Sequence, residues 1–302
     1  MGDYGPSAPP LHSTPVGNPS HPAPSANEIS VLVTGFGPFK TNLVNASYLI
    51  ASSLPPSFTF PSPKFKEAGE GEVEQEDEVE RRISLHVHPF PIPVAYATVR
   101  EMLPVILEQY AAAHDGRRPD LIIHIGIASP RPYYSVETLA HRDDYNITDI
   151  EGRSGYEDGE KRWREMGLPP VLSPGLAMEE NEDNNSTGTD VTSTGISISA
   201  SAKTRLAIPY PPDDHFLQMW KSLAPENLDL RISQDPGHYL CDFIFYTSLS
   251  LAKQQGADRN TLFLHVPGAS EDADIERGRE IALALIKTMV TCWIDEKREV
   301  PP

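Results

Sequence analysis

Short apolar runs alternate with longer segments of helical periodicity along most of this sequence. Five runs have the β-branched, alternating or fully apolar patterns of strands: 29–34, 83–91, 121–125, 228–233 and 261–264. Five segments have apolar residues at helical spacing: about 44–54, 94–113, 213–224, 240–254 and 274–297. Such alternation predicts an α/β fold, in which a single three-layer α/β/α domain holds a mostly parallel, twisted sheet with helices on both faces.

The stretch from Ser233 to Tyr246 has the pattern of a strand end, a sharp turn and the start of a helix. Pro236-Gly237 breaks the preceding strand, and no Pro or Gly follows between residues 240 and 254. We therefore expect Cys241 in the first helical turn. Unpaired backbone N–H groups and the positive end of the helix macrodipole favour a thiolate there. A small, buried and inert core cysteine is the competing interpretation.

Other candidate residues also follow predicted strands. Phe36 and Phe39 lie in the loop after the first strand, and His265 stands at the end of the strand at 261–264. Ligands of parallel α/β sheets bind beyond the carboxyl ends of the strands. The position of Cys241 after another strand therefore predicts one shared site.

A cysteine at a helix start and a histidine at a strand end can form a nucleophile–base pair. Imidazole takes the thiol proton, the thiolate attacks a carbonyl carbon, and the imidazolium then protonates the leaving amine. A carboxylate behind the histidine would fix its tautomer and stabilise its positive charge. The residue types leave open which of the 43 acidic residues serves His265 in this way.

The charge of the chain is strongly negative but unevenly distributed. The formal net charge is −18, with eight acidic side chains within residues 67–80 and five within 176–195. This balance argues against a nucleic-acid or anionic-membrane partner, because both require basic patches. No apolar run approaches the roughly 20 residues that span a bilayer, and we expect no secretory signal.

Cysteine usage points to a reducing compartment. The sequence holds two cysteines, Cys241 and Cys292, which do not indicate a disulfide framework. We therefore expect a cytoplasmic protein. Cys292 falls on the last predicted helix, far from any turn, and is expected to be a buried, inert thiol.

Low-complexity stretches divide the chain. Residues 1–27 are rich in Pro and Ser and predict a disordered tail. We expect residues 28–302 to form one domain with inserts at about 61–81 and 176–203. The first insert belongs to a Pro-rich and then Glu-rich stretch, 55–81, which we expect to be solvated and disordered. Residues 146–176 contain several Gly, Pro and charged residues and predict a loop, and 205–208 predicts a short strand.

Cofactor motifs are incomplete. Gly35 and Gly37 follow the first strand, but Lys40 occupies the third glycine position of a dinucleotide fingerprint. His86 and His88 alternate on a strand without a clear third ligand. We expect neither a metal nor an organic cofactor.

Four motifs carry a resemblance to a known family: Val33-Thr34-Gly35-Phe36-Gly37-Pro38-Phe39, His124-Ile125-Gly126 followed by Glu137, Ser233-Gln234-Asp235-Pro236-Gly237-His238-Tyr239-Leu240-Cys241-Asp242-Phe243, and Phe263-Leu264-His265-Val266-Pro267. They resemble the motifs of pyroglutamyl-peptidase I, cysteine peptidases that remove an N-terminal pyroglutamate. The 24-residue step from Cys241 to His265 also matches. The resemblance covers about residues 29–60, 83–150 and 204–298, and the low-complexity insertions make the chain similar to fungal members.

The resemblance implies a role for each candidate. Cys241 would be the nucleophile, His265 the base and acid, and Glu137 the acid that orients the histidine. Phe36 and Phe39 would form walls of the pocket for the flat lactam ring, with Tyr239 nearby. An apolar slot suits a neutral lactam, whereas a charged amino terminus would lack a partner there. The expected partners are peptides with N-terminal pyroglutamate, and the oligomeric state stays open.

Three positions depart from the family pattern. Pro236 stands where the family usually has Ala, Lys40 where it has Gly, and Arg142 where it has Asn. Two alternatives therefore stay beside the peptidase: a non-catalytic relative that binds N-terminally blocked peptides, and a thiol amidase with another acyl preference.

Overall fold

The computed structural model describes residues 28–39, 42–62, 79–129, 131–177 and 210–295. Several sequence predictions lie outside these ranges: the tail at 1–27, most of both inserts, the strand at 205–208 and the environment of Lys40.

Within the described residues, seven strands form one sheet in the order β2-β3-β1-β4-β9-β5-β8. In chain order the strands are β1 (Glu28–Gly35), β2 (Ser57–Ser62), β3 (Val79–Val87), β4 (Leu121–Ile127), β5 (Tyr134–Glu137), β8 (Leu230–Ser233) and β9 (Thr261–Val266). Strands β3, β1, β4 and β9 are mutually parallel. Strand β2 is antiparallel to β3, β5 is antiparallel to β9, and β8 is parallel to β5. The prediction of an α/β fold with a mostly parallel sheet is confirmed.

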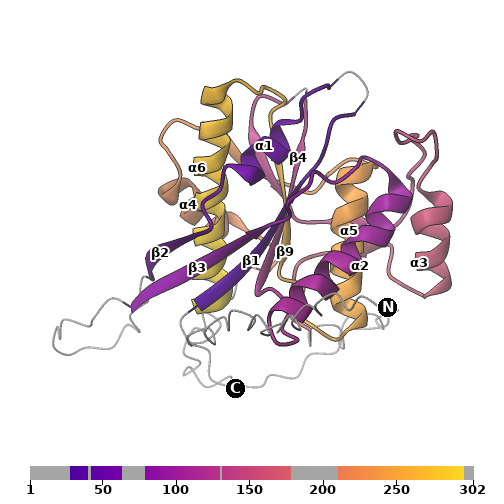
Figure 1. Ribbon diagram of the computed structural model, residues 1–302, viewed down its shortest axis with the longest axis horizontal. Helices are drawn as coiled ribbons and strands as arrows, with labels where there is room; N and C mark the ends of the chain where they lie inside the picture. The colour runs from indigo at the N-terminus through magenta and orange to yellow at the C-terminus, as the bar shows by residue number, and fades with distance from the viewer. Residues whose placement is uncertain (1–27, 40–41, 63–78, 130, 178–209, 296–302) are drawn as a thin grey trace, which may run out of the picture.

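Helices cover both faces of this sheet (Figure 1). The longer ones are α1 (Ala46–Ser52), α2 (Tyr96–Ala113), α4 (Asp214–Leu223), α5 (Leu240–Gln254) and α6 (Asp272–Met289). Helices α1, α4 and α6 pack on one face, and α2 and α5 pack on the other. None of the helices in the described ranges combines the length and apolarity needed to cross a membrane.

The central strands are apolar on both sides because both sides are covered. All seven residues of β4 are buried. In β1, Val31 and Val33 contribute to the core under α1 and α6, whereas Leu32 between them contributes to the core under α2 and α5. This is the two-residue alternation of a strand, and it explains why the sequence shows continuous apolar runs here.

Strand β2 lies where the sequence analysis placed a solvated, Pro-rich stretch, and that part of the prediction is wrong. Phe58 and Phe60 alternate with polar residues, pair with β3 and lie near the ammonium group of Lys287 on α6. Pro61 argued against a strand in the sequence, because proline cannot donate a backbone hydrogen bond. A proline is tolerated on an edge strand because one side of such a strand has no neighbour to bond.

The predicted loop at 146–176 also contains regular structure. A π-helical turn (Tyr156–Glu160) leads into α3 (Lys161–Glu165), and β7 (Val171–Leu172) pairs with β6 (Ala140–His141). Trp163, Leu168 and Leu172 are buried and anchor this segment in the core on the α2 and α5 side of the sheet. Three apolar anchors at irregular spacing give no periodicity, so the glycines, prolines and charges of the segment suggested a loop instead.

Gly35 at the end of β1 allows α1 to approach the sheet closely. A Cβ atom at this position would lie 2.6 Å from the Ser47 carbonyl oxygen and 2.6 Å from the Tyr48 Cα atom. Both are backbone atoms, which cannot rotate away. This contact fixes the start of the loop that carries Phe36 and Phe39.

We expect Gly35→Ala to lower the free energy of unfolding by about 2–3 kcal/mol, near the upper end of the usual cost of overpacking. The measurement is chemical denaturation of wild type and variant. Ala112→Ser on the exposed side of α2 is the control and should stay within about 0.5 kcal/mol of wild type. Equal stability of Gly35→Ala and wild type would contradict the close approach.

Candidate active site

His265 and Glu137 meet because β5 and β9 are antiparallel neighbours. Ser135 lies directly opposite His265 in this pairing, and Glu137 lies opposite Phe263. Opposed residues, and residues two positions apart on one strand, point to the same face of a sheet. Ser135, Glu137, Phe263 and His265 therefore all face the side covered by α2 and α5.

The Glu137–His265 contact is short and enclosed. His265 Nδ1 and Glu137 Oε1 lie 2.7 Å apart, and the side chains are 4 % and 0 % exposed. A carboxylate at this distance holds Nδ1 protonated, which leaves Nε2 available to accept a proton. The structure thus brings together two of the three residues expected in the catalytic set.

Two further side chains hold the Glu137 carboxylate. Oε1 accepts hydrogen bonds from Ser135 Oγ at 3.1 Å and from the Arg131 guanidinium at 3.1 Å. Arg131 also donates to the Asp235 carbonyl at 3.0 Å, in the turn before α5. Buried charges are costly unless they are paired. Arg131 supplies the pairing and links Glu137 to the turn that precedes Cys241.

Sequence reasoning missed Arg131 and Ser135, although a signal was present. Both stand at two-residue steps before Glu137, the spacing of one strand face. Arg131 precedes β5 itself, which begins at Tyr134. Pattern inspection gives such neighbours no role until the charge of Glu137 is known to be buried.

Cys241 lies in the first turn of α5, as predicted, and Tyr239 is the N-cap residue. The Cys241 Sγ atom borders Gly126 on β4, because a Cβ atom added to Gly126 would lie only 3.0 Å from the sulfur. The same Cβ would clash with the Phe263 ring at 2.5 Å, and that ring packs on the His265 imidazole with centroids 4.7 Å apart. Gly126 thus leaves room for the thiol beside the Phe263–His265 pair.

The expectation of a lowered thiol pKa is wrong for the substrate-free chain. Part of Cys241 remains accessible, but enclosure of the thiol raises its pKa, and the negative charges of Glu137 and Asp242 raise it further. Arg131 and the backbone N–H of Cys241 act in the opposite direction. Desolvation and two nearby carboxylates outweigh the helix start here.

No hydrogen bond joins Cys241 Sγ to His265 within the described residues. In free enzymes such catalytic contacts are often long and tighten when substrate binds. Cys241 and the His265–Glu137 pair therefore lie on the same side of the sheet, close to Gly126 and Phe263.

The three aromatic candidates, which we call the aromatic wall, share one apolar cluster with Cys241. Phe36 is part of this cluster on the α2 and α5 side of the sheet, and Phe39, Tyr239 and Cys241 pack against it. Phe36 is buried, and the rings of Phe39 and Tyr239 lie 6.2 Å apart. Tyr96, at the start of α2, extends this wall with its ring 5.9 Å from Tyr239. Tyr239 also donates a hydrogen bond to the Thr148 carbonyl at 3.3 Å. Tyr96 was not foreseen, because helix-start aromatics usually have only a packing role.

The two surface pockets found elsewhere in the described chain do not contain the Cys–His–Glu set. One is lined by Arg118, Asp120 and Asn260 among others, and the second includes Pro132, Asp229 and Arg277. Neither brings a nucleophile next to a base, so the chemistry favours the Cys241 region over these two pockets.

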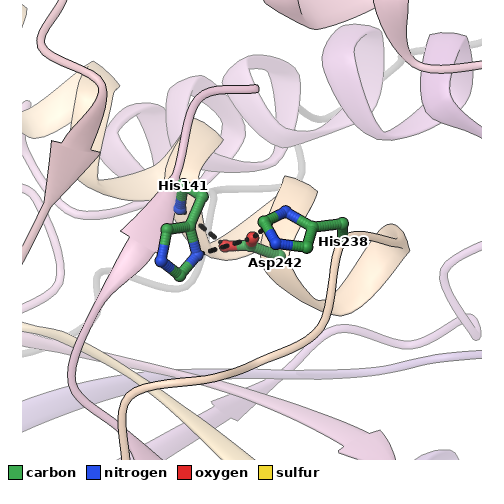
Figure 2. Close-up of side chains that lie close together, drawn as sticks. All are labelled: His141, His238 and Asp242. Atoms are coloured by element: carbon green, nitrogen blue, oxygen red, sulfur yellow. Dashed lines mark hydrogen bonds and ion pairs between the residues drawn. The ribbon is translucent and has the colours of Figure 1, made fainter. Parts of the chain in front are cut away.

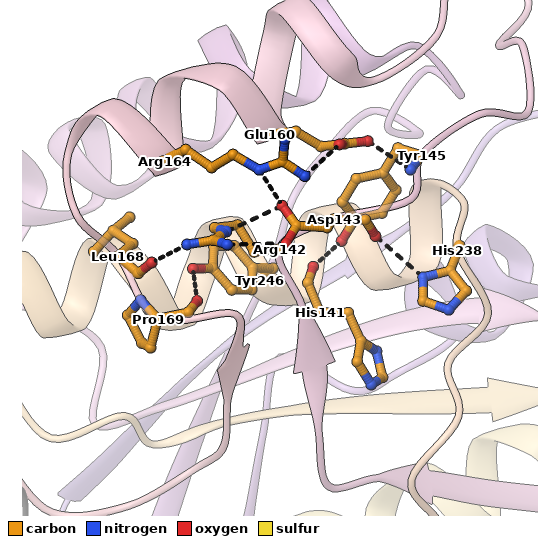
Figure 3. Close-up of polar contacts among 10 residues, drawn as sticks. All are labelled: His141, Arg142, Asp143, Tyr145, Glu160, Arg164, Leu168, Pro169, His238 and Tyr246. Atoms are coloured by element: carbon orange, nitrogen blue, oxygen red, sulfur yellow. Dashed lines mark hydrogen bonds and ion pairs between the residues drawn. The ribbon is translucent and has the colours of Figure 1, made fainter. Parts of the chain in front are cut away.

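Arg142, the departure next to the acid motif, has a structural explanation (Figure 3). Its guanidinium makes two hydrogen bonds of 3.0 Å to the Asp143 carboxylate and one of 2.6 Å to the Leu168 carbonyl. Asp143 also pairs with Arg164 on α3 at 2.9 Å. Arg142 therefore joins the strand after Glu137 to the α3 segment and does not point to a change in the chemistry.

Comparison with known proteins agrees with this geometry. The chain is 25 % identical to mouse pyroglutamyl-peptidase 1 over 261 residues, which cover 86 % of the chain and 90 % of the relative. The human protein is 24 % identical with the same coverage. The chain is a pyroglutamyl-peptidase I-like hydrolase. This confirms the resemblance seen in the sequence motifs. No family model matches the chain.

Solved structures show the same fold. Pyrrolidone carboxyl peptidase from Pyrococcus furiosus aligns with a TM-score of 0.54 at 20 % identity, covering 87 % of this chain and 98 % of that one. Pyroglutamyl peptidase I from Bacillus amyloliquefaciens gives 0.52 at 21 % identity, covering 89 % and 97 %. The described part of this chain therefore has the fold of these peptidases.

The raised thiol pKa predicts how the reaction of Cys241 with iodoacetamide depends on pH when no substrate is added. The rate should keep rising with pH beyond about 8.5, the ordinary pKa of a thiol, because the reactive thiolate forms late. Mass spectrometry of samples quenched over a pH series, in a buffer with a chelator, measures this rate. Cys241→Ala reports on fully buried Cys292, which should react far more slowly. A plateau reached below pH 7 would instead indicate a preformed thiolate–imidazolium pair.

Proposed function

We propose that the chain is a cysteine peptidase that hydrolyses the amide bond after an N-terminal pyroglutamyl residue. The observation that carries this proposal is the buried 2.7 Å contact between His265 and Glu137 next to the helix start that presents Cys241. A nucleophile, a base and an orienting acid are the three groups that acyl transfer requires. The pyroglutamyl-peptidases to which the chain is similar support the substrate assignment.

The proposed chemistry begins with proton transfer. His265 Nε2 accepts the Cys241 proton while its Nδ1–H stays on Glu137, and the carboxylate stabilises the imidazolium that forms. The thiolate attacks the pyroglutamyl carbonyl carbon. Backbone N–H groups at the start of α5 stabilise the oxyanion.

Three further proton transfers complete the cycle. The imidazolium protonates the leaving amine as the amide bond breaks, which leaves a thioester on Cys241. A water molecule, deprotonated by His265, then attacks the thioester carbonyl. As the carbon–sulfur bond breaks and pyroglutamate leaves, the imidazolium returns its proton to the sulfur and regenerates the thiol.

The aromatic wall suits the proposed acyl group. Pyroglutamate has a compact, neutral lactam ring, which can pack against Phe36, Phe39 and Tyr239 without burying a charge. A peptide with a free amino terminus would bring an ammonium group into the same slot. It would lose its hydration there without gaining a partner, so it is expected to be rejected.

A second candidate function is binding of N-terminally blocked peptides without turnover, or turnover of another acyl group. It draws support from the missing Cys241–His265 hydrogen bond in the described chain and from the raised thiol pKa. The buried pairing of His265 with Glu137 favours the peptidase, because binding of a blocked peptide does not require an oriented base. A cytoplasmic location accompanies the peptidase proposal, since a catalytic thiol stays reduced in that compartment.

We expect release of a fluorogenic amine from a pyroglutamyl amide by wild type and a loss of at least about a thousandfold in Cys241→Ala, because the acyl-transfer step loses its nucleophile. Cys292→Ala is the matched control and should retain activity. Binding of a pyroglutamyl peptide by folded wild type without release would select the binding module. A panel of other N-acyl amides separates an altered acyl preference from both.

Arg131→Gln should lower kcat by about ten- to a hundredfold, because hydrogen bonds to charged groups contribute about 1.5–3 kcal/mol and Glu137 would lose its buried partner. KM should change little if Arg131 acts only through Glu137. Arg131→Lys should restore part of the rate and of the pH profile. Arg231→Gln removes an exposed ion pair with Asp229 and is the control. An unchanged kcat in Arg131→Gln would rule out this positioning role.

A further inference from the structure

A second cluster of chemically active side chains lies beside the candidate catalytic set and shares no residue with it. His141 comes from β6, His238 from the turn before α5, and Asp242 from the first turn of α5 (Figure 2). One potential ligand atom of each residue lies within 4.8 Å of those of the other two. The two imidazole rings flank the Asp242 carboxylate, and both are directed toward it.

The distances fit a small ion. Asp242 Oδ2 lies 3.0 Å from His141 Nδ1 and 3.8 Å from His238 Nδ1. Tetrahedral zinc with ligand bonds of about 2.0–2.2 Å separates its ligand atoms by about 3.3–3.5 Å. The two Asp242 distances differ from this spacing by about 0.3–0.5 Å. The ligand atoms of the two imidazoles lie within 4.8 Å of each other, so the rings would have to turn inward to place all three atoms around one ion.

The carboxylate is already held in position. Asp242 has no exposed side-chain surface, and its Oδ1 accepts the His141 backbone N–H at 2.8 Å. Oδ2 is thereby directed at the two imidazoles. A buried carboxylate is retained in proteins when it is paired or binds a metal ion, and a hydrogen bond to its second oxygen is the usual support of a metal ligand.

The histidines leave the cluster open to solvent. The His141 and His238 side chains are 25 % and 44 % exposed. An ion can therefore enter, and a fourth position remains for water. Strand β6, which carries His141, is itself held in place. The Tyr145 hydroxyl donates a hydrogen bond to the His141 carbonyl, and Arg142 donates one to the Asp143 carboxylate (Figure 3).

We propose that His141, His238 and Asp242 form a binding site for a divalent transition-metal ion of the zinc type, with one position left for water. Two imidazoles and one carboxylate favour zinc and its first-row neighbours over Mg²⁺ and Ca²⁺, which prefer sets of oxygen ligands. His238 and Asp242 are four residues apart across a helix start, whereas His141 is supplied from a distant strand.

This site is independent of the proposed peptidase chemistry. Without an ion, His141 Nδ1 bonds to Asp242, and His238 Nδ1 lies 3.2 Å from the Asp143 carbonyl oxygen. A metal ion would replace both contacts and would join β6 to the first turn of α5. A hydrogen-bond network with no affinity for metals is the competing interpretation.

Isothermal titration with Zn²⁺ tests the proposal, using the untagged full-length chain with Cys241→Ala so that the catalytic thiol cannot bind the ion. We expect one strong site with micromolar or tighter affinity. His238→Ala and Asp242→Asn should each weaken it by at least about tenfold. His215→Ala, at an exposed position on α4, is the matched control and should leave the affinity unchanged.

Substitution with Co²⁺ gives a second readout that does not depend on affinity alone. The intense visible absorption of tetrahedral Co²⁺ should appear with one equivalent and be lost in His238→Ala, whose side chain is not required for packing. Circular dichroism verifies that each variant folds. Absence of strong Zn²⁺ binding to folded protein, or equal binding with and without His238, would overturn the proposal.

Discussion

The antiparallel pairing of β5 with β9 is the constraint on which the site depends. It places Glu137 and His265 on one face of the sheet at hydrogen-bonding distance and buries the carboxylate completely. A buried charge requires compensation, and Arg131, Ser135 and His265 provide it around one oxygen atom. The four central parallel strands form the frame, but the reversed strand beside them supplies the acid.

The pKa of the Cys241 thiol depends on several opposing effects. The start of α5 offers backbone N–H groups to Cys241, yet enclosure and two carboxylates keep its pKa raised. A raised pKa favours the neutral thiol, so the proposed chemistry requires His265 to take the proton. A neutral thiol beside an oriented imidazole is protected from indiscriminate reaction, because the thiolate is the reactive species.

The segment after Glu137 links both clusters of the molecule. Arg142 and Asp143 attach it to α3, and His141 attaches it to Asp242, the residue after Cys241. The first turn of α5 is thus held from two directions, by Arg131 through the Asp235 carbonyl and by the His141–Asp242 contact. Bound metal at the second cluster would strengthen one of these two attachments.

The sequence by itself determined the order of the five predicted strands and five predicted helices, the helix start at Cys241 and the strand end at His265. These are local signals: apolar periodicity, a Pro-Gly break and the absence of helix breakers. The resemblance to a family predicted a role for Glu137, although the residues alone left all 43 acids open. The tertiary structure decided what local patterns cannot encode. The reversed direction of β5, the partners Arg131 and Ser135, the edge strand β2 and the meeting of His141 with Asp242 all depend on contacts between segments far apart in the chain, where burial and charge compensation outweigh local propensity.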